Sequence, residues 1–393
     1  MRILYHHRTQ GRGAEGNHIV SIVSALRALG HHVDVLSPPG VDPFDPAATI
    51  PVDKAKTTTR GWSSVWKLMS RKLPNWLFEI AEVVYNVPAY FRLRKALAAG
   101  RYDLLFERYA FFLVAGVLAA RRSHCRFLLE INEVSGIPNR ARHQSFERLC
   151  AMFERFIMRR ATRVHAVSSW LGERAVAAGL PRERLVVAAN GFEVSRLKLT
   201  QSREAMRRQL RLDAGVVIGF AGWFDRWDRL DFLIDVFNDL RATHPRLKLC
   251  LVGAGPAAEA LAEKARASPY AADIVLTGAV PRQQVYDYIQ TFDLGVLPHS
   301  NVFGSPIVMF EMMGLGIPLV LPRLPPIEDV HRDADTALLF TPLDFAGCRA
   351  TLARMLSDDA LRTAIATRAS AKLTGEHTWR DTASRILANL PNN

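Results

Sequence analysis

Residues 293–318, DLGVLPHSNVFGSPIVMFEMMGLGIP, hold the clearest group of atoms suited to binding an anion. A buried strand leads into a polar loop, and a helix is expected to begin at Ser305 and Pro306, with Ser305 as its N-cap. Unpaired N–H groups and the positive end of the helix dipole there suit a diphosphate. Glu311, further along the helix, could accept hydrogen bonds from sugar hydroxyls. The alternative is an ordinary strand–helix junction with a solvated or core glutamate.

A glycine-rich loop near the N-terminus is the second candidate for a ligand-binding segment. Gly11, Gly13 and Gly16 satisfy the spacing GxGxxG after a first predicted strand, and glycines let the backbone approach a ligand closely. A helix over residues 18–29 follows, so the loop is long for a dinucleotide-binding fingerprint. The acidic residue of that fingerprint is also missing, since Asp34 lies inside the second predicted strand. A simple surface loop is the alternative.

Polar residues stand where two further strands are predicted to end. Glu107 and Arg108 close the strand DLLFER, and in an open α/β sheet this position faces the ligand crevice. A local ion pair between these two side chains is an equally good interpretation. Asn132 lies just after Glu130, near the exit of the next strand. His165, inside a later strand, is expected to be a core histidine rather than a ligand.

Gly253 and Gly255 form a second pattern of this kind, GAGPAA, between a buried strand and a helix. That order is the one a dinucleotide site requires, so a dinucleotide-dependent enzyme is one alternative function. Pro256 within the pattern, and the position of the pattern deep in the chain, argue against it.

Composition and charge exclude several classes of protein. The chain has 393 residues, enough for two or three domains, and four scattered cysteines without a CxxC pair. No HExxH or His/Asp cluster is found, so we expect no metal site and a reducing, cytosolic compartment. Neither a signal peptide nor a membrane-spanning segment is expected. The net charge of +13 favours anionic partners, but without a recognisable binding motif nucleic acid is not an expected one.

Residues 60–97 are both basic and aromatic, with Trp62, Trp66 and Trp76 among several lysines and arginines. One interpretation is a patch that touches an anionic membrane, with basic side chains on the head groups and aromatic rings at the interface. The other is one or two amphipathic helices that cover a sheet and bury their aromatic residues.

The elements that must position these residues alternate between strand and helix along both halves of the chain. A polar, basic stretch over residues 193–214 interrupts the alternation, and we place a domain boundary there, between residues 195 and 196. The pattern predicts an α/β protein with two Rossmann-like parallel-sheet domains facing a cleft, residues 1–195 and 196–375. A C-terminal helix at about 376–393 could pack back on the first domain.

Seven stretches, in this order along nearly the whole chain, resemble the retaining glycosyltransferases of family 4, which have the GT-B fold. They are GHHVDVLSP, DLLFERY, AVSSWL, GLPRERLVVAANGFE, LVGAGP, GAVPRQQVYDYIQTFDLGVLP and FGSPIVMFEMMGLGIPLV. The resemblance implies transfer of a sugar from a nucleoside diphosphate sugar, with retention of anomeric configuration and without a metal or other cofactor. The departing phosphate would then accept the proton of the acceptor hydroxyl.

The resemblance also implies roles for particular residues. Asn132 stands where relatives often carry a histidine, and Arg226 or Arg229 could replace the arginine and lysine whose places Trp223 and Asp228 take. These three, Asn132, Arg226 and Arg229, are the catalytic candidates. The donor-binding candidates are Gly222, Gly253, Gly255, Gly304, Ser305, Pro306, Ile307 and Glu311. Candidates for the acceptor or sugar side are Gly13, Glu15, Gly16, Glu107 and Arg108. Phe303 and Val308 occupy positions where relatives offer a glutamate and a lysine.

The expected partners are a nucleotide sugar and a glycan or lipid-linked acceptor, with an anionic membrane surface as a further partner. The expected location is the cytoplasm, extending to the inner face of the membrane. The lost glutamate and lysine positions leave a second alternative, a catalytically degenerate relative that binds a membrane surface.

Overall fold

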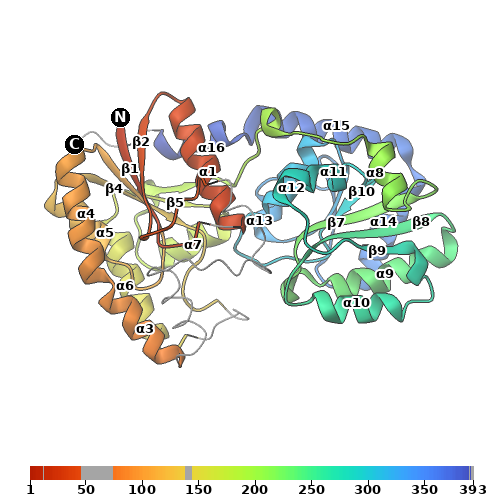
Figure 1. Ribbon diagram of the computed structural model, residues 1–393, viewed down its shortest axis with the longest axis horizontal. Coiled ribbons are helices and arrows are strands. Elements are labelled where there is room, and N and C mark those ends of the chain that lie inside the picture. Colours follow the sequence, from red (N-terminus) through yellow and green to blue (C-terminus); the bar gives the residue numbers. More distant parts are fainter. Residues whose placement is uncertain (12, 46–73, 138–143, 389, 391–393) are drawn as a thin grey trace. The chain divides into compact units, whose positions relative to one another are not determined.

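The computed structural model describes residues 1–11, 13–45, 74–137, 144–388 and 390. It confirms the α/β class, because each half of the chain forms a six-stranded parallel sheet with helices on its faces (Figure 1). Unit 1 comprises Met1–Ala189 and Trp379–Asn393, and unit 2 comprises Asn190–Thr378. Unit 2 thus begins at Asn190, six residues before the expected start at residue 196, and Asn190 is hydrogen-bonded to Ser305 of the same unit.

Unit 1 is built on the strand order β2-β1-β3-β4-β5-β6. Its strands are β1 (Arg2–His6), β2 (His32–Leu36), β3 (Leu104–Arg108), β4 (Arg126–Ile131), β5 (Arg163–Ala166) and β6 (Leu185–Val187). Its helices are α1 (Gly13–Ala28), α3 (Asn75–Val84), α4 (Asn86–Gly100), α5 (Ala115–Arg122), α6 (Glu147–Arg160), α7 (Ser169–Ala177), the short η2 (Arg182–Arg184) and α16 (Trp379–Leu387). The C-terminal helix α16 packs on α1.

Unit 2 has the order β12-β11-β10-β7-β8-β9, the doubly wound order of a dinucleotide-binding fold. Its strands are β7 (Val216–Trp223), β8 (Leu247–Ala254), β9 (Ile274–Leu276), β10 (Leu294–Val296), β11 (Leu319–Pro322) and β12 (Leu338–Phe340). Its helices are η3 (Val194–Arg196), α8 (Arg203–Gln209), η4 (Arg226–Asp228), α9 (Leu230–Thr243), α10 (Ala258–Arg266), η5 (Ala271–Asp273), η6 (Arg282–Gln284), α11 (Val285–Ile289), α12 (Ile307–Gly314), α13 (Pro325–Glu328), α14 (Phe345–Ser357) and α15 (Asp359–Glu376).

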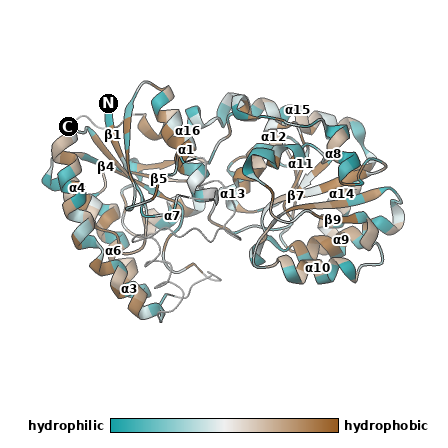
Figure 2. Ribbon diagram, viewed as in Figure 1, coloured by the Kyte–Doolittle hydropathy of each residue, from teal (hydrophilic) through white to brown (hydrophobic). Residues whose placement is uncertain are grey.

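Both sheets form because their strands are short apolar runs that helices cover on either side. Figure 2 shows the apolar residues along the strands of each unit. Ile3, Leu105 and Leu128 are fully buried in unit 1, as are Ile218 and Leu249 in unit 2. Ligands of such sheets bind beyond the carboxyl ends of the strands, where the strand order reverses. The reversal lies between β1 and β3 in unit 1 and between β7 and β10 in unit 2.

Helix α1 begins at Gly13, five residues earlier than the sequence indicated. The expected long glycine loop is therefore wrong, and Gly13 and Gly16 belong to the first turns of the helix. Close packing explains the glycine at position 16, because a Cβ atom there would lie 2.3 Å from the carbonyl oxygen of Gly11. Gly11 itself has a φ of +64°, in the left-handed region that glycine favours.

The basic and aromatic stretch is only partly described. Residues 60–73, with Trp62 and Trp66, lie outside the described residues, and the described part of the stretch forms α3 and α4. Among the described residues, no helix combines the length and the apolar character that crossing a bilayer requires.

Candidate functional site

The loops after β7 and β10 meet at the point where the strand order of unit 2 reverses. His299, in the loop after β10, donates from Nδ1 to the carbonyl oxygen of Trp227 in the loop after β7, at 2.9 Å. Most of the donor-side residues predicted from sequence belong to these two loops or to α12. The fold of unit 2 therefore gathers residues that are some 80 positions apart into one region at the carboxyl edge of the sheet.

Helix α12 begins at Ile307 with Pro306 as its N-cap, so the expected cap at Ser305 is wrong. The Ser305 hydroxyl is used elsewhere, because its Oγ accepts from the backbone N–H of Asn190 at 3.1 Å. The carbonyl of Ser305 accepts from Asn190 Nδ2 at 2.7 Å. The first N–H groups of a helix have no partner within it, so α12 still presents donors beside Pro306. Asn190 is buried, yet its Oδ1 has no hydrogen-bond partner.

The N–H of Gly304 is already bonded within the loop. Asn301 Oδ1 accepts from the backbone N–H groups of Phe303, at 3.2 Å, and of Gly304. A Cβ atom on Gly304 would lie 2.8 Å from that same oxygen. The structure therefore gives Gly304 a local role in holding the loop, in addition to the donor contact predicted for it.

Glu311 is buried on α12 and forms an ion pair with Arg282, at 2.5 Å between Oε1 and Nη2. Tyr286 also lies 3.4 Å from the same oxygen through its hydroxyl. Burial raises the pKa of Tyr286, and the nearby Glu311 carboxylate raises it further, so the phenol stays protonated and can donate. The glutamate predicted to accept hydrogen bonds from sugar hydroxyls is thus held in place by an arginine and a tyrosine from the segment 282–286.

The loop after β7 places its two candidate arginines differently. Arg226 is exposed in η4, whereas Arg229 forms a bidentate ion pair with Asp231, with both contacts at 3.0 Å. Gly222 is exposed at the end of β7 with a φ of +156°. Asp228, at the position where relatives carry a lysine, is buried enough that its pKa rises to about 7. Its Oδ2 accepts from the N–H of Asp225 at 3.1 Å, as part of a capping box.

The glycines of the GAGPAA pattern have a packing role. A Cβ atom on Gly253 would lie 1.9 Å from the carbonyl oxygen of Gly222, where β7 and β8 run side by side. A Cβ atom on Gly255 would lie 2.5 Å from the carbonyl oxygen of Phe224. Contacts between neighbouring strands therefore account for these glycines without a dinucleotide.

In unit 1 the polar residues at the strand ends converge on Glu130. Its Oε1 lies 2.8 Å from Arg108 Nη1, 2.8 Å from Asn132 Nδ2 and 2.9 Å from His18 Nε2. Burial alone would raise the pKa of Glu130, but His18, His165 and Arg108 outweigh it and hold that pKa well below its usual range. Because the Asn132 amide group donates to Glu130, its oxygen is the atom left to meet a ligand.

One of the two interpretations of Glu107 and Arg108, a local ion pair between them, is wrong. They do not pair with each other, because successive side chains of a strand point to opposite faces of the sheet. Glu107 Oε2 lies 2.6 Å from His6 Nδ1, and both side chains are buried. Arg108 is bonded to Glu130, so neither residue has an ionic group free in the crevice. Gly13 and Glu15 are exposed in the first turn of α1, whereas Gly16 is buried.

The sequence interpretation missed several residues that the structure places at these sites: His18, Glu130, Asn190, Arg282 and Tyr286. His165 is a core histidine as expected, since its Nε2 donates to the carbonyl oxygen of Ala188 at 2.8 Å. Asn190 precedes Gly191, and this pair is a typical turn signal that gives no indication of a binding role. For the other residues of this group the sequence offers one clue, a polar side chain within an apolar stretch. That pattern does not indicate which group the side chain contacts.

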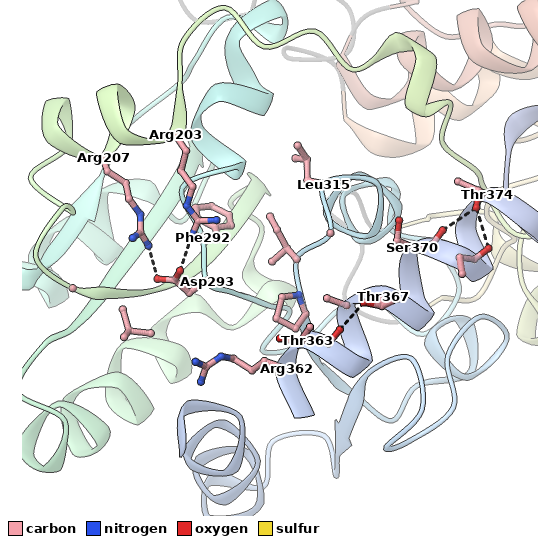
Figure 3. Close-up of a pocket in the computed structure, with 17 residues that line it drawn as sticks. Arg203, Arg207, Phe292, Asp293, Leu315, Arg362, Thr363, Thr367, Ser370 and Thr374 are labelled. Carbon is pink, nitrogen blue, oxygen red and sulfur yellow. Dashed lines mark hydrogen bonds and ion pairs between the residues drawn. The ribbon is translucent and has the colours of Figure 1, made fainter. Parts of the chain in front are cut away.

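A separate pocket lies at the other edge of the unit 2 sheet. It encloses about 760 Å³ between α8, the loop after α12 and α15 (Figure 3). Arg203 and Arg207 both point at Asp293, which precedes β10 and pairs with both of them. Since Gly215 and Pro318, which line it, precede strands, this pocket is at the amino ends of the strands and apart from the candidate site. No cluster of three metal-ligating side chains occurs among the described residues.

Two sequence profiles match this chain. One, described as "Glycosyl transferase 4-like domain", matches residues 13–191, and the other, "Glycosyl transferases group 1", matches residues 215–358. EpsF of Bacillus subtilis, named as a candidate glycosyltransferase, is 25% identical over 174 residues, which are 43% of this chain and 44% of that protein. D-inositol 3-phosphate glycosyltransferase of Corynebacterium urealyticum is 24% identical over 219 residues, 52% of this chain and 50% of the relative. The matches thus span about half, or less, of these curated relatives.

Solved structures show the same fold. HepE of Anabaena, in complex with UDP, superposes with a TM-score of 0.71 at 17% identity, over 98% of both chains. A glycosyltransferase from Rickettsia africae has a TM-score of 0.72 at 13% identity, over 99% of both chains.

Proposed function

The chain belongs to the glycosyltransferases with the GT-B fold, and on that premise we propose that it transfers a sugar from a nucleoside diphosphate sugar to an acceptor hydroxyl. One observation carries the proposal. At the carboxyl edge of the unit 2 sheet, the N-terminus of α12 lies beside the buried, unpartnered Oδ1 of Asn190, and the same helix carries the buried Glu311. A diphosphate and a ribose need this combination of donors and acceptors.

In this proposal unit 2 binds the donor. The first backbone N–H groups of α12, at Ile307 and Val308, would bind the diphosphate, and Arg226 would add a positive charge from the loop after β7. Arg229 is a weaker candidate, because Asp231 already neutralises its charge. Glu311 would accept from the ribose hydroxyls while Arg282 and Tyr286 hold its carboxylate in position.

We propose that the reaction retains the anomeric configuration. The bond between the sugar and the diphosphate breaks, the acceptor oxygen forms its bond on the same face of the sugar, and a phosphate oxygen takes the acceptor proton. Charge builds up on the leaving diphosphate, and fixed donors aimed at it stabilise the transition state. Because these donors belong to the protein, we expect transfer to survive treatment with EDTA.

Unit 1 would contribute the sugar or acceptor side. Asn132 is the residue of this group whose orientation the structure fixes, because its amide group donates to Glu130. Its amide oxygen is thereby available to accept a hydrogen bond from a sugar hydroxyl. A lipid-linked or polysaccharide acceptor fits the excess of basic residues in unit 1.

One observation favours a second candidate, a degenerate relative that binds nucleotide without transferring sugar. Where relatives carry a glutamate, a lysine and another lysine, this chain has Phe303, Val308 and Asp228. The two candidates differ in a measurable outcome, since only the first forms product.

The test is a thermal-shift screen of the full chain against a panel of nucleotides and nucleotide sugars, followed by mass spectrometry of products with glycan and lipid-linked acceptors. The proposal expects one nucleotide class to raise the melting temperature, and Glu311→Ala to abolish that rise. Glu328→Ala is the matched control, because Glu328 also lies near an arginine but is exposed. Stabilisation without product would favour the degenerate relative, and no stabilisation by any compound would contradict both candidates.

A further inference from the structure

Five large apolar side chains form an exposed stripe along α3 and α4 of unit 1: Trp76, Ile80, Val84, Val87 and Phe91. Between 41% and 67% of the surface of each is exposed. Their spacing of three or four residues places them on one face of a helix. The helical path is nearly continuous, since Tyr85 between α3 and α4 has helical φ and ψ, and the two helices run end to end along one side of unit 1 (Figure 1). We call these residues the α3–α4 stripe.

The acidic residues of these helices point the other way. Glu79 is buried and accepts from the backbone N–H groups of Ser145 and Phe146, at 2.6 and 2.7 Å. Glu82 is buried against Arg8, at 2.5 Å. A helix on the surface of a globular protein normally turns its charged face to water and its apolar face inward. Here two acids are inward and the largest exposed side chains are apolar, which marks a surface that binds something.

Charge indicates the kind of partner. With both acids of α3 and α4 buried, the ionic side chains that these helices present to solvent are basic, as at Lys95. Arg121 and Arg122 are exposed at the end of α5, which packs against α4. The residues of unit 1 include 30 lysines and arginines against 16 acids, whereas those of unit 2 include 21 against 22. The excess of positive charge in the chain thus belongs to the unit that carries the stripe.

We propose that the α3–α4 stripe is a docking surface for an anionic lipid bilayer. The apolar side chains lie in the boundary between head groups and acyl chains, with Trp76 at the interface that tryptophan prefers. Lys95 of α4 and the exposed Arg121 and Arg122 of α5 contact lipid phosphates, which adds an electrostatic attraction that salt weakens. The helices lie along the surface and do not cross it. This binding is independent of the proposed glycosyl transfer and can be tested without a nucleotide sugar.

The experiment is flotation of the full chain with phosphatidylcholine vesicles that either contain or lack phosphatidylglycerol. The proposal expects binding to the anionic vesicles, weakened by added salt. The double variant Val84→Asp/Phe91→Asp should reduce the partition coefficient at least about tenfold, because it places two charges on the apolar face that the bilayer would bury. Lys95→Glu should reduce it about fivefold or more, because it removes one attractive charge and adds a repulsive one. Leu199→Asp, at an exposed leucine of unit 2, is the matched control and should bind as the native chain does.

A second readout locates the contact. Tryptophan fluorescence should be quenched by bromine-labelled acyl chains, and Trp76→Phe should reduce that quenching. Circular dichroism of each variant checks that it is folded. If the double variant does not fold, Val87→Ser and Lys95→Glu serve in its place.

Three results would overturn the proposal. The first is no binding to anionic vesicles at low salt. The second is binding that the stripe variants and Leu199→Asp alter equally. The third is a concentration-dependent dimer, seen by light scattering, that the double variant dissociates, since the stripe would then bind a second copy of the chain.

Discussion

Asp228 provides a test whose sign and size follow from the structure. Burial raises the pKa of its carboxyl group from 3.8 to about 7, and its negative neighbour Asp225 adds to this, although a hydrogen bond from the Asp225 N–H opposes it. The folded chain therefore holds this proton more tightly than the unfolded chain does. The contribution to stability is complete below pH 3.8 and is lost as the pH rises through about 7.

The interval between the two pKa values corresponds to about 4 kcal/mol between the protonation states. About 2–3 kcal/mol of this is lost between pH 5 and pH 8, by the linkage relation. In Asp228→Asn the amide carries no charge, and its oxygen can still accept from the N–H of Asp225. The variant should therefore become more stable than the native chain by that amount on going from pH 5 to pH 8.

The assay is urea unfolding at both pH values, followed by circular dichroism, with proteolysis and mass spectrometry assigning the transition to unit 2. Asp231→Asn is the control with the opposite sign, because the hydrogen bond from Arg229 lowers the pKa of Asp231. That variant should lose stability near neutral pH. If Asp228→Asn changes stability equally at pH 5 and pH 8, the carboxyl group is ionised in the folded chain and the reasoning is wrong.

Three further predictions concern residues at the carboxyl ends of strands, two of them in unit 1 and one in unit 2. Glu130→Gln should destabilise unit 1 by about 3–5 kcal/mol in chemical denaturation, because it leaves the buried Arg108 without its ion-pair partner. Glu173→Gln, at an exposed ion pair, is the control and should leave the stability nearly unchanged. Gly253→Ala should lower the free energy of unfolding by about 2–3 kcal/mol, because the new Cβ atom meets the Gly222 carbonyl oxygen at a φ of +141°. Gly375→Ala is the control and should leave that free energy unchanged, because nothing lies within 4 Å of a Cβ atom there. Asn132→Ala should lower the rate of transfer while leaving nucleotide affinity, measured by calorimetry, unchanged, and an equal loss of both would contradict its place on the sugar side.

The fold followed from sequence because the signals for it are local. Apolar runs such as VVIGF, each followed by an amphipathic helix, are sufficient to predict a parallel sheet whatever the rest of the chain does. The helix over residues 307–314 and its glutamate were found in the same way. The errors were at element ends: α1 begins at Gly13, and Pro306 rather than Ser305 caps α12, because contacts with Gly11 and Asn190 decide those ends.

What the sequence determined by itself is therefore the order of strands and helices and the segments that end at the carboxyl edge of each sheet. Only the tertiary structure decided which polar groups meet. Glu130 is bound by side chains from α1 and β3, and Asn190 is bonded to Ser305, 115 positions along the chain. It also decided that Glu79 and Glu82 turn inward while Trp76 and Phe91 face water. Periodicity records which side chains share a face, whereas the burial of a charge depends on a partner that folding brings from elsewhere.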